Sequence, residues 1–104
     1  MGKNEKCTWD DRKQAINITT HGYDFAMLSD VFNGRFLYTK QDMRFDYGET
    51  RYNSLVLYQE RVINITFTQR EDKNHLISVR PASRNERKIY DAQKAIHDSH
   101  AVRP

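Results

Sequence analysis

The chain has 104 residues, enough for one domain and too few for two independent hydrophobic cores. Hydrophobic residues make up 38% of it and charged residues 30%, a composition that excludes a disordered chain. The single cysteine, Cys7, cannot close an intramolecular disulfide, and residues 1–9 contain no apolar run of the length that a signal peptide or a membrane span requires. We therefore expect a cytoplasmic protein that makes no use of a membrane.

Two short helices are expected near the N-terminus. The first spans residues 10–22, between Asp10 as the N-cap and Gly22 as a left-handed stop, although the β-branched residues at 16–20 also fit a strand. The second begins at Asp24 and ends at residues 33–34. Its apolar side chains recur at helical spacing and are assigned to the core: Phe25, Leu28 and Phe32.

From residue 35 onward the apolar pattern becomes an alternation, which predicts an antiparallel sheet of three to four strands. Turns at 59–61 and 71–74 divide the central part of the chain into hairpins. In the last strand, regular alternation places Leu76, Ser78 and Arg80 on one face and Ile77 and Val79 on the other.

A helix is expected to start after Pro81, because Ser83 and Glu86 form an S-x-x-E capping box. Its apolar stripe, which includes Ile89 and Ile96, is expected to lie across the sheet. Residues 97–104 lack a periodic pattern, so we expect a domain over 1–96 followed by a flexible tail. The pair His97-x-x-His100 in this tail has no third ligand nearby, and we expect no metal site and no cofactor.

Charge is distributed unevenly along the chain. The net charge is +3, yet residues 1–79 hold eleven basic and eleven acidic residues, and the excess lies beyond residue 79. A basic end of this kind suits a polyanion such as nucleic acid, and it is equally typical of a solvated helix.

Three blocks of the sequence resemble the BrnT toxin family. The first, from Trp9 to Phe25, is similar to the pattern W-D-x-x-K-x-x-x-N-x-x-x-H-G-V-x-F, and the second is G-E-x-R-Y at 48–52. The third, from Ile77 to Tyr90, is similar to I-S-A-R-x-A-[ST]-x-x-E-R-x-x-Y. The resemblance implies a small α+β domain of the RelE-like type, in which two N-terminal helices, the antiparallel sheet and a C-terminal helix packed on the sheet form one unit.

The resemblance also implies a function. It is that of the toxin of a type II toxin-antitoxin system, which cleaves RNA and so inhibits translation and growth. The implied partners are the RNA substrate and a cognate DNA-binding antitoxin of the BrnA type. Operator DNA would be contacted only indirectly, through the antitoxin complex.

Metal-independent RNA cleavage by the ribose 2′-hydroxyl needs a base, an acid and cations for the phosphorane. Guanidinium groups bind phosphate oxygens in pairs, which makes Arg80 and Arg84 the first candidates and Arg51 the next. Arg80 is also expected beside the positive N-terminus of the last helix. Glu49 and His21 are the candidate bases. Further RNA-binding residues are expected at three basic positions: Lys13, Arg87 and Lys88.

Structural roles compete with these assignments. Arg80 can instead pair with Glu49 or Glu86 and tie the last strand to the helix, and His21 can stabilise the C-terminus of its own helix. Glu86 is assigned to the capping box and left out of the catalytic site. The competing function is a non-catalytic nucleic-acid-binding or protein-interaction module, in which the same arginines only neutralise phosphates.

Overall fold

The computed structural model describes residues 2–3, 6–44, 46 and 48–101. Its strands are β1 (Gly2–Lys3), β2 (Cys7–Trp9), β3 (Tyr38–Asp42), β4 (Arg51–Tyr58), β5 (Arg61–Arg70) and β6 (Lys73–Pro81). Its helices are α1 (Asp11–His21), the 3₁₀ turns η1 (Phe25–Met27) and η2 (Ser29–Phe32), and α2 (Arg84–Ala101). The predicted α+β class is confirmed.

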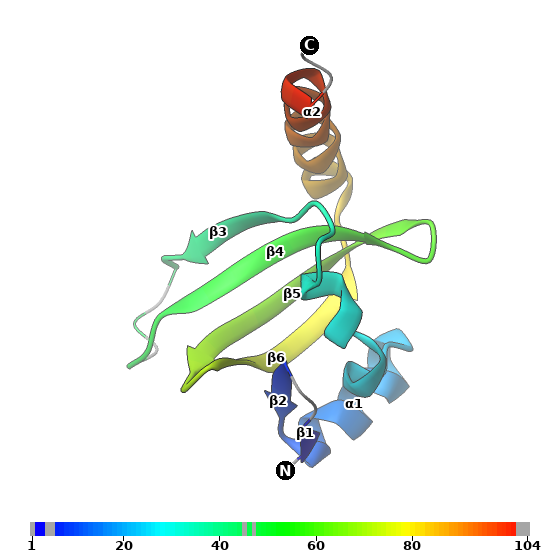
Figure 1. Cartoon of the computed structure of the whole chain (residues 1–104). Coiled ribbons are helices and arrows are strands. Elements are labelled where there is room, and N and C mark those ends of the chain that lie inside the picture. Colours follow the sequence, from blue (N-terminus) through cyan, green and yellow to red (C-terminus); the bar gives the residue numbers. More distant parts are fainter. Residues whose placement is uncertain (1, 4–5, 45, 47, 102–104) are drawn as a thin grey trace.

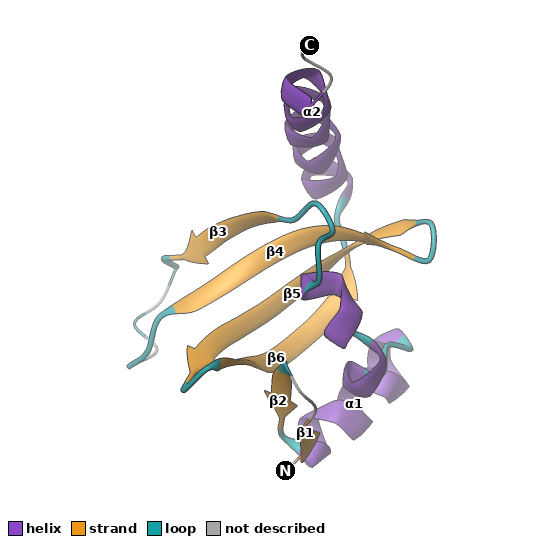
Figure 2. Ribbon diagram, viewed as in Figure 1, coloured by secondary structure: helices purple, strands orange, loops and turns teal. Residues whose placement is uncertain are grey.

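The strands form one sheet in the order β1-β2-β6-β5-β4-β3 (Figures 1 and 2). Strands β3 to β6 pair as an antiparallel meander, as predicted. The prediction of three to four antiparallel strands is nevertheless wrong, because β2 adds a parallel neighbour to β6 and β1 pairs with β2 at the edge. Strands of two and three residues are too short to show an alternating pattern in the sequence.

Helix α1 begins and ends where the sequence predicted, and the strand alternative is wrong. The Oδ1 atom of Asp10 accepts hydrogen bonds from the backbone N–H groups of Arg12 at 2.8 Å and Lys13 at 3.2 Å. Gly22 ends the helix in the left-handed region with φ 78°.

The second predicted α-helix is wrong, although Asp24 caps the segment by accepting from the backbone N–H of Ala26. The segment forms the two 3₁₀ turns η1 and η2 instead. Its fully buried residues are Phe25, Leu28 and Val31, which recur every three residues. That spacing is the period of a 3₁₀ helix and aligns all three side chains with the core.

The core lies between one face of the sheet and the segment containing η1 and η2. It contains the fully buried side chains of Cys7, Phe25, Leu28, Val31, Val56, Ile63, Ile65, Leu76 and Val79. Helix α1 contributes a polar anchor, since Asn17 is its one buried residue. The Oδ1 atom of Asn17 accepts from the backbone N–H of Val79 at 3.0 Å. This N–H group lies on the edge of β6 beyond the residues that pair with β2, so Asn17 supplies the acceptor that a neighbouring strand would otherwise provide.

A β-bulge in β6 decides which of its side chains share a face. Thr66 pairs with Ser78 and Phe67 pairs with Leu76, so Ile77 is an extra residue in β6. Leu76 and Val79 therefore both enter the core. The predicted alternation along this strand is wrong, because an inserted residue changes the face of every side chain beyond it.

Helix α2 projects away from the sheet (Figure 1). Buried Tyr90 packs against Phe36 with ring centroids 5.6 Å apart, and the ring of His97 lies 4.8 Å from the same Phe36 ring. Ile89 and Ile96 remain 38% and 53% exposed, so the predicted packing of the apolar stripe across the sheet is wrong. The contact between α2 and the sheet is a small apolar cluster, in which Tyr90 packs with Leu55 and Tyr38.

The helix also continues to Ala101, so residues 97–101 are helical where a flexible tail was expected. Residues 102–104 lie outside the described residues. The proposed domain boundary at residue 96 stays a prediction.

Candidate functional site

The face of the sheet opposite the core is polar, and the strand register arranges its side chains in rows. One row runs across β3 to β6 through Tyr38, Leu55, Asn64 and Arg80. The next contains Lys40, Asn53, Thr66 and Ser78. The third contains Asp42 and Arg51 on β3 and β4, and Thr68 and His75 on β5 and β6. We call this surface the polar face.

At one end of the polar face, Glu49 lies between two arginines. Its Oε2 atom is 3.2 Å from Nη2 of Arg70, and its Oε1 atom is 3.7 Å from Nε of Arg51. The side chains of Glu49, Arg51 and Arg70 are 29%, 25% and 52% exposed, so solvent reaches all three. Two guanidinium groups around one carboxylate leave a net positive charge suited to a phosphate group.

His75 lies beside this cluster and is a residue that the sequence analysis missed. Its ring is buried, and Nδ1 lies 2.8 Å from the hydroxyl oxygen of Thr8. Burial lowers the pKa of His75 below its ordinary value of 6.5, and the positive charge of Arg70 adds to the effect. Lys13 also lowers this pKa, whereas Glu49 and Asp10 act against the shift. The imidazole is therefore neutral near pH 7 and able to accept a proton.

The bulge in β6 explains why the sequence pattern did not predict His75 as a site residue. Regular alternation places residue 75 on the same face as Ile77 and Val79, which is the core face. The observed register pairs His75 with Thr68 and Ser78 with Thr66, and this puts His75 on the polar face with Arg80.

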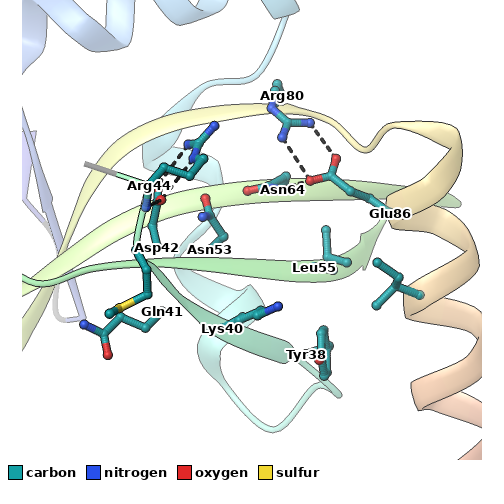
Figure 3. Close-up of a pocket in the computed structure, with 12 residues that line it drawn as sticks. Tyr38, Lys40, Gln41, Asp42, Arg44, Asn53, Leu55, Asn64, Arg80 and Glu86 are labelled. Atoms are coloured by element: carbon teal, nitrogen blue, oxygen red, sulfur yellow. Dashed lines mark hydrogen bonds and ion pairs between the residues drawn. The ribbon is translucent and has the colours of Figure 1, made fainter.

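At the other end of the polar face, Glu86 holds Arg80. The Nη1 and Nη2 atoms of Arg80 donate to Oε1 and Oε2 of Glu86 at 2.7 and 3.0 Å (Figure 3). Glu86 also accepts from the backbone N–H of Ser83 at 2.8 Å and from Nδ2 of Asn64 at 2.7 Å. Led by the Arg80 hydrogen bonds, these contacts lower the pKa of Glu86 to about 2. The capping box is confirmed, and Arg80 does tie the strand to the helix through Glu86.

The remaining predicted site residues do not converge on one point. Arg84, Arg87 and Lys88 are exposed on the first turns of α2, and in the described part of the chain no carboxylate pairs with them. Lys13 lies near the start of α1, close enough to influence His75. His21 is exposed at the opposite end of α1, about 12 Å further along the helix axis.

Arg51 and Arg80 share the polar face without meeting. Their rows are about 13 Å apart along the strands, and Arg80 is engaged by Glu86. The structure therefore brings Glu49 and Arg51 together beside His75, and it leaves Arg80, Arg84 and His21 outside that cluster.

A pocket of about 640 Å³ lies between the polar face and the start of α2 (Figure 3). Tyr38, Leu55 and Ile89 form its apolar part, and Lys40 and Arg80 are among the cations that line it.

Among the described residues, no group of three His, Cys, Asp or Glu side chains is placed to hold a metal ion. None of the helices within the described ranges has the length and apolar character needed to cross a membrane.

The protein is thus a small α+β domain with an open polar sheet face, and the cationic groups at both ends of this face suit it to binding an anionic polymer. The family model described as "Ribonuclease toxin, BrnT, of type II toxin-antitoxin system" matches residues 9–86, and the chain belongs to this family. The family assignment made from the three sequence blocks is thus confirmed. No curated protein matches the chain. Membership implies an RNA target and an antitoxin partner.

Proposed function

We propose that the chain is a metal-independent endoribonuclease that cleaves RNA by attack of a ribose 2′-hydroxyl on the adjacent phosphate. The site is the cluster of Glu49, Arg51, Arg70 and His75. The observation that carries this proposal is the placing of two guanidinium groups, a carboxylate and a neutral imidazole at one end of an open polar face.

The two arginines bind the phosphate. Arg51 and Arg70 flank Glu49, which restrains both guanidinium groups through its two carboxylate oxygens. As the 2′-oxygen attacks, negative charge grows on the non-bridging oxygens, and cations already in place stabilise the transition state more than the ground state.

His75 is the base that the geometry favours, and Glu49 is the alternative. Contact of Nδ1 with Thr8 leaves Nε2 as the ring nitrogen for the substrate. The base takes the 2′-hydroxyl proton and returns it to the departing 5′-oxygen. The products are a 2′,3′-cyclic phosphate and a free 5′-hydroxyl, and no other reactant is needed.

The basic residues near α2 extend the RNA-binding surface beyond the cleaved bond. Arg80, Arg84, Arg87 and Lys88 would neutralise neighbouring phosphates rather than take part in the chemistry. Cleavage of messenger RNA would inhibit translation and growth. The proposed partner that restrains this activity is a DNA-binding antitoxin of the BrnA type, which would link the toxin to operator DNA.

The test is incubation of the purified protein with single-stranded RNA in excess chelator. Arg51→Ala should reduce the cleavage rate at least about 100-fold, because one cationic partner of the transition state is lost. Arg61→Ala is the matched control, since Arg61 is exposed at the first position of β5 and its replacement should leave the rate unchanged. Salt-sensitive RNA binding without cleavage by the wild-type protein would instead favour a non-catalytic binding module.

A further inference from the structure

A second pocket, of about 330 Å³, lies beside His75 and shares no lining residue with the pocket at the start of α2. It is lined by Asp10, Asp11, Arg12, Arg70 and His75, and we call it the His75 pocket. His75 is only 7% exposed, so most of its ring is covered. Nε2 makes no hydrogen bond with the described residues and is not among their fully buried atoms that lack a partner. This nitrogen therefore keeps exposed surface, and the His75 pocket gives access to it.

Thr8 contacts the other ring nitrogen and is held there by the sheet. The parallel register of β2 and β6 places Thr8 opposite His75. The backbone N–H of Asn74 donates to the carbonyl oxygen of Lys6 at 3.0 Å and strengthens this pairing. Both neighbours of Thr8 in β2 are buried in the core, so alternation directs the Thr8 side chain to the polar face. A slip of β2 by one residue would turn Thr8 into the core and break its contact with His75.

A hydroxyl group suits this contact because it can accept a hydrogen bond and carries no charge. If His75 is the base, Nε2 has to be free of a proton, so the neutral ring carries its proton on Nδ1. Nδ1 then donates to the Thr8 hydroxyl oxygen, which lies 2.8 Å away. After Nε2 has taken the 2′-hydroxyl proton, Nδ1 still carries its own proton and the same hydrogen bond persists. The ring can therefore accept a proton and return it without turning.

The absence of charge on Thr8 matters as much as its hydrogen bond. A carboxylate at this position would also hold the ring, but it would stabilise the protonated form. Burial lowers the pKa of His75, nearby cations add to the effect and nearby carboxylates oppose it; these charged groups are Arg70, Lys13, Glu49 and Asp10. An uncharged partner leaves this balance unchanged, so the ring stays neutral near pH 7 and can act as a base.

We infer that Thr8 is a positioning residue of the proposed nuclease: its hydroxyl accepts a hydrogen bond from Nδ1 of His75 and so presents Nε2 to the substrate. The inference rests on the proposed function, with His75 as the base. Thr8 itself makes no contact with the reacting atoms and acts only through the ring. Functional side chains that are held by a second layer of hydrogen bonds keep the geometry that the reaction requires.

Nuclear magnetic resonance of the ring nitrogens tests the hydrogen bond without RNA. The signals of His75 are identified by their loss in His75→Gln. At about pH 8, above the ordinary pKa of histidine, the wild-type ring should carry its proton on Nδ1. Thr8→Val removes the acceptor and should shift the proton towards Nε2, whereas Thr8→Ser should retain the wild-type form. A wild-type ring with its proton on Nε2 would overturn the inference, because Nε2 could not then accept the substrate proton.

Cleavage of single-stranded RNA in excess chelator tests whether the hydrogen bond serves the reaction. Thr8→Val should lower the rate at least about tenfold, since a correctly placed base contributes about 100-fold or more. Thr8→Ser should restore most of the rate. Thr39→Val is the matched control, because it removes a hydroxyl that lies 2.7 Å from Oγ of Ser54 on the other face of the sheet, and it should leave the rate unchanged. Thermal unfolding checks that all variants are folded.

Thr8→Asp adds a readout that a purely structural role would not change. It keeps an acceptor for Nδ1 and adds a negative charge, which raises the pKa of the base. The acidic limb of the pH–rate profile should therefore move to higher pH by about one unit. An unchanged profile in Thr8→Asp, a wild-type rate in Thr8→Val or a folded Thr8→Ser without activity would overturn the inference.

The two proposals fail separately. Cleavage by the wild type that Thr8→Val leaves unchanged would refute the role of Thr8, and the nuclease proposal would stand with Glu49 as the base. If the wild type does not cleave RNA, the nuclease proposal fails, and the proton position measured on the ring still decides whether Thr8 accepts from Nδ1.

Discussion

Replacing Glu86 by Gln tests the junction between β6 and α2. The substitution keeps the shape of the side chain and removes its charge. One carboxylate oxygen is replaced by an NH₂ group, which cannot accept the hydrogen bonds that this oxygen accepts in the wild type. Those donors are the Arg80 guanidinium, the backbone N–H of Ser83 and Nδ2 of Asn64. The free energy of unfolding should therefore fall.

The size of the loss follows from the pKa of Glu86, which is lowered from 4.5 to about 2. At roughly 1.4 kcal/mol for each pH unit, this lowering of the pKa sets an upper bound of about 3.5 kcal/mol. Because the side chains of Glu86 and Arg80 are 22% and 42% exposed, solvent screening reduces the expected loss to about 1–2 kcal/mol. For a domain of this size, that corresponds to a melting temperature about 10 °C lower.

The sign of the pH dependence is set by the lowered pKa. The folded state binds the Glu86 proton less readily than the unfolded chain does, so the stabilisation is complete above about pH 4.5 and is lost as the pH falls towards 2. Urea unfolding of wild type and Glu86→Gln at pH 7 and at several acidic pH values measures this difference. The gap between the two proteins should close as the pH is lowered.

Asp98→Asn is the matched control on the same helix. Asp98 pairs with Lys94 at 2.7 Å, but its side chain is 57% exposed, so its removal should cost only about 0.5 kcal/mol. Two results would refute this account of the junction. One is a Glu86→Gln protein as stable as wild type at pH 7, and the other is a parallel loss of stability by wild type and Glu86→Gln between pH 4.5 and 2.

Three further substitutions test other parts of the structure. Asn17→Leu leaves the backbone N–H of Val79 without its acceptor and should lower the free energy of unfolding by about 2 kcal/mol in urea, whereas an unchanged midpoint would show that this bond is dispensable. Because the pKa of His75 is lowered, the unfolded chain binds its proton first, and stability should decline as the pH falls below about 6.5; His75→Gln should remove that decline between pH 7.5 and 5. Gly22→Ala should cost about 1 kcal/mol by thermal unfolding, since φ is 78° and an added Cβ meets nothing within 4 Å; a larger loss would indicate a packing role.

Features that depend on neighbouring residues were predictable from the sequence. The cap at Asp10, the stop at Gly22 and the capping box of Ser83 and Glu86 are all observed, because each involves atoms within four residues of one another. The spaced blocks containing Glu49, Arg51 and Arg80 likewise identified the family, and two of these residues lie in the candidate catalytic cluster.

The rest of the site depends on contacts between distant parts of the chain. The parallel pairing of β2 with β6 brings Thr8 to His75 across 67 positions, and no local pattern encodes that contact. The bulge at Ile77 then turns His75 towards the polar face. The sequence by itself determined the caps, the hairpins and the family. Only the tertiary structure decided which charged side chains share a surface, because strand register and burial are properties of the assembled sheet.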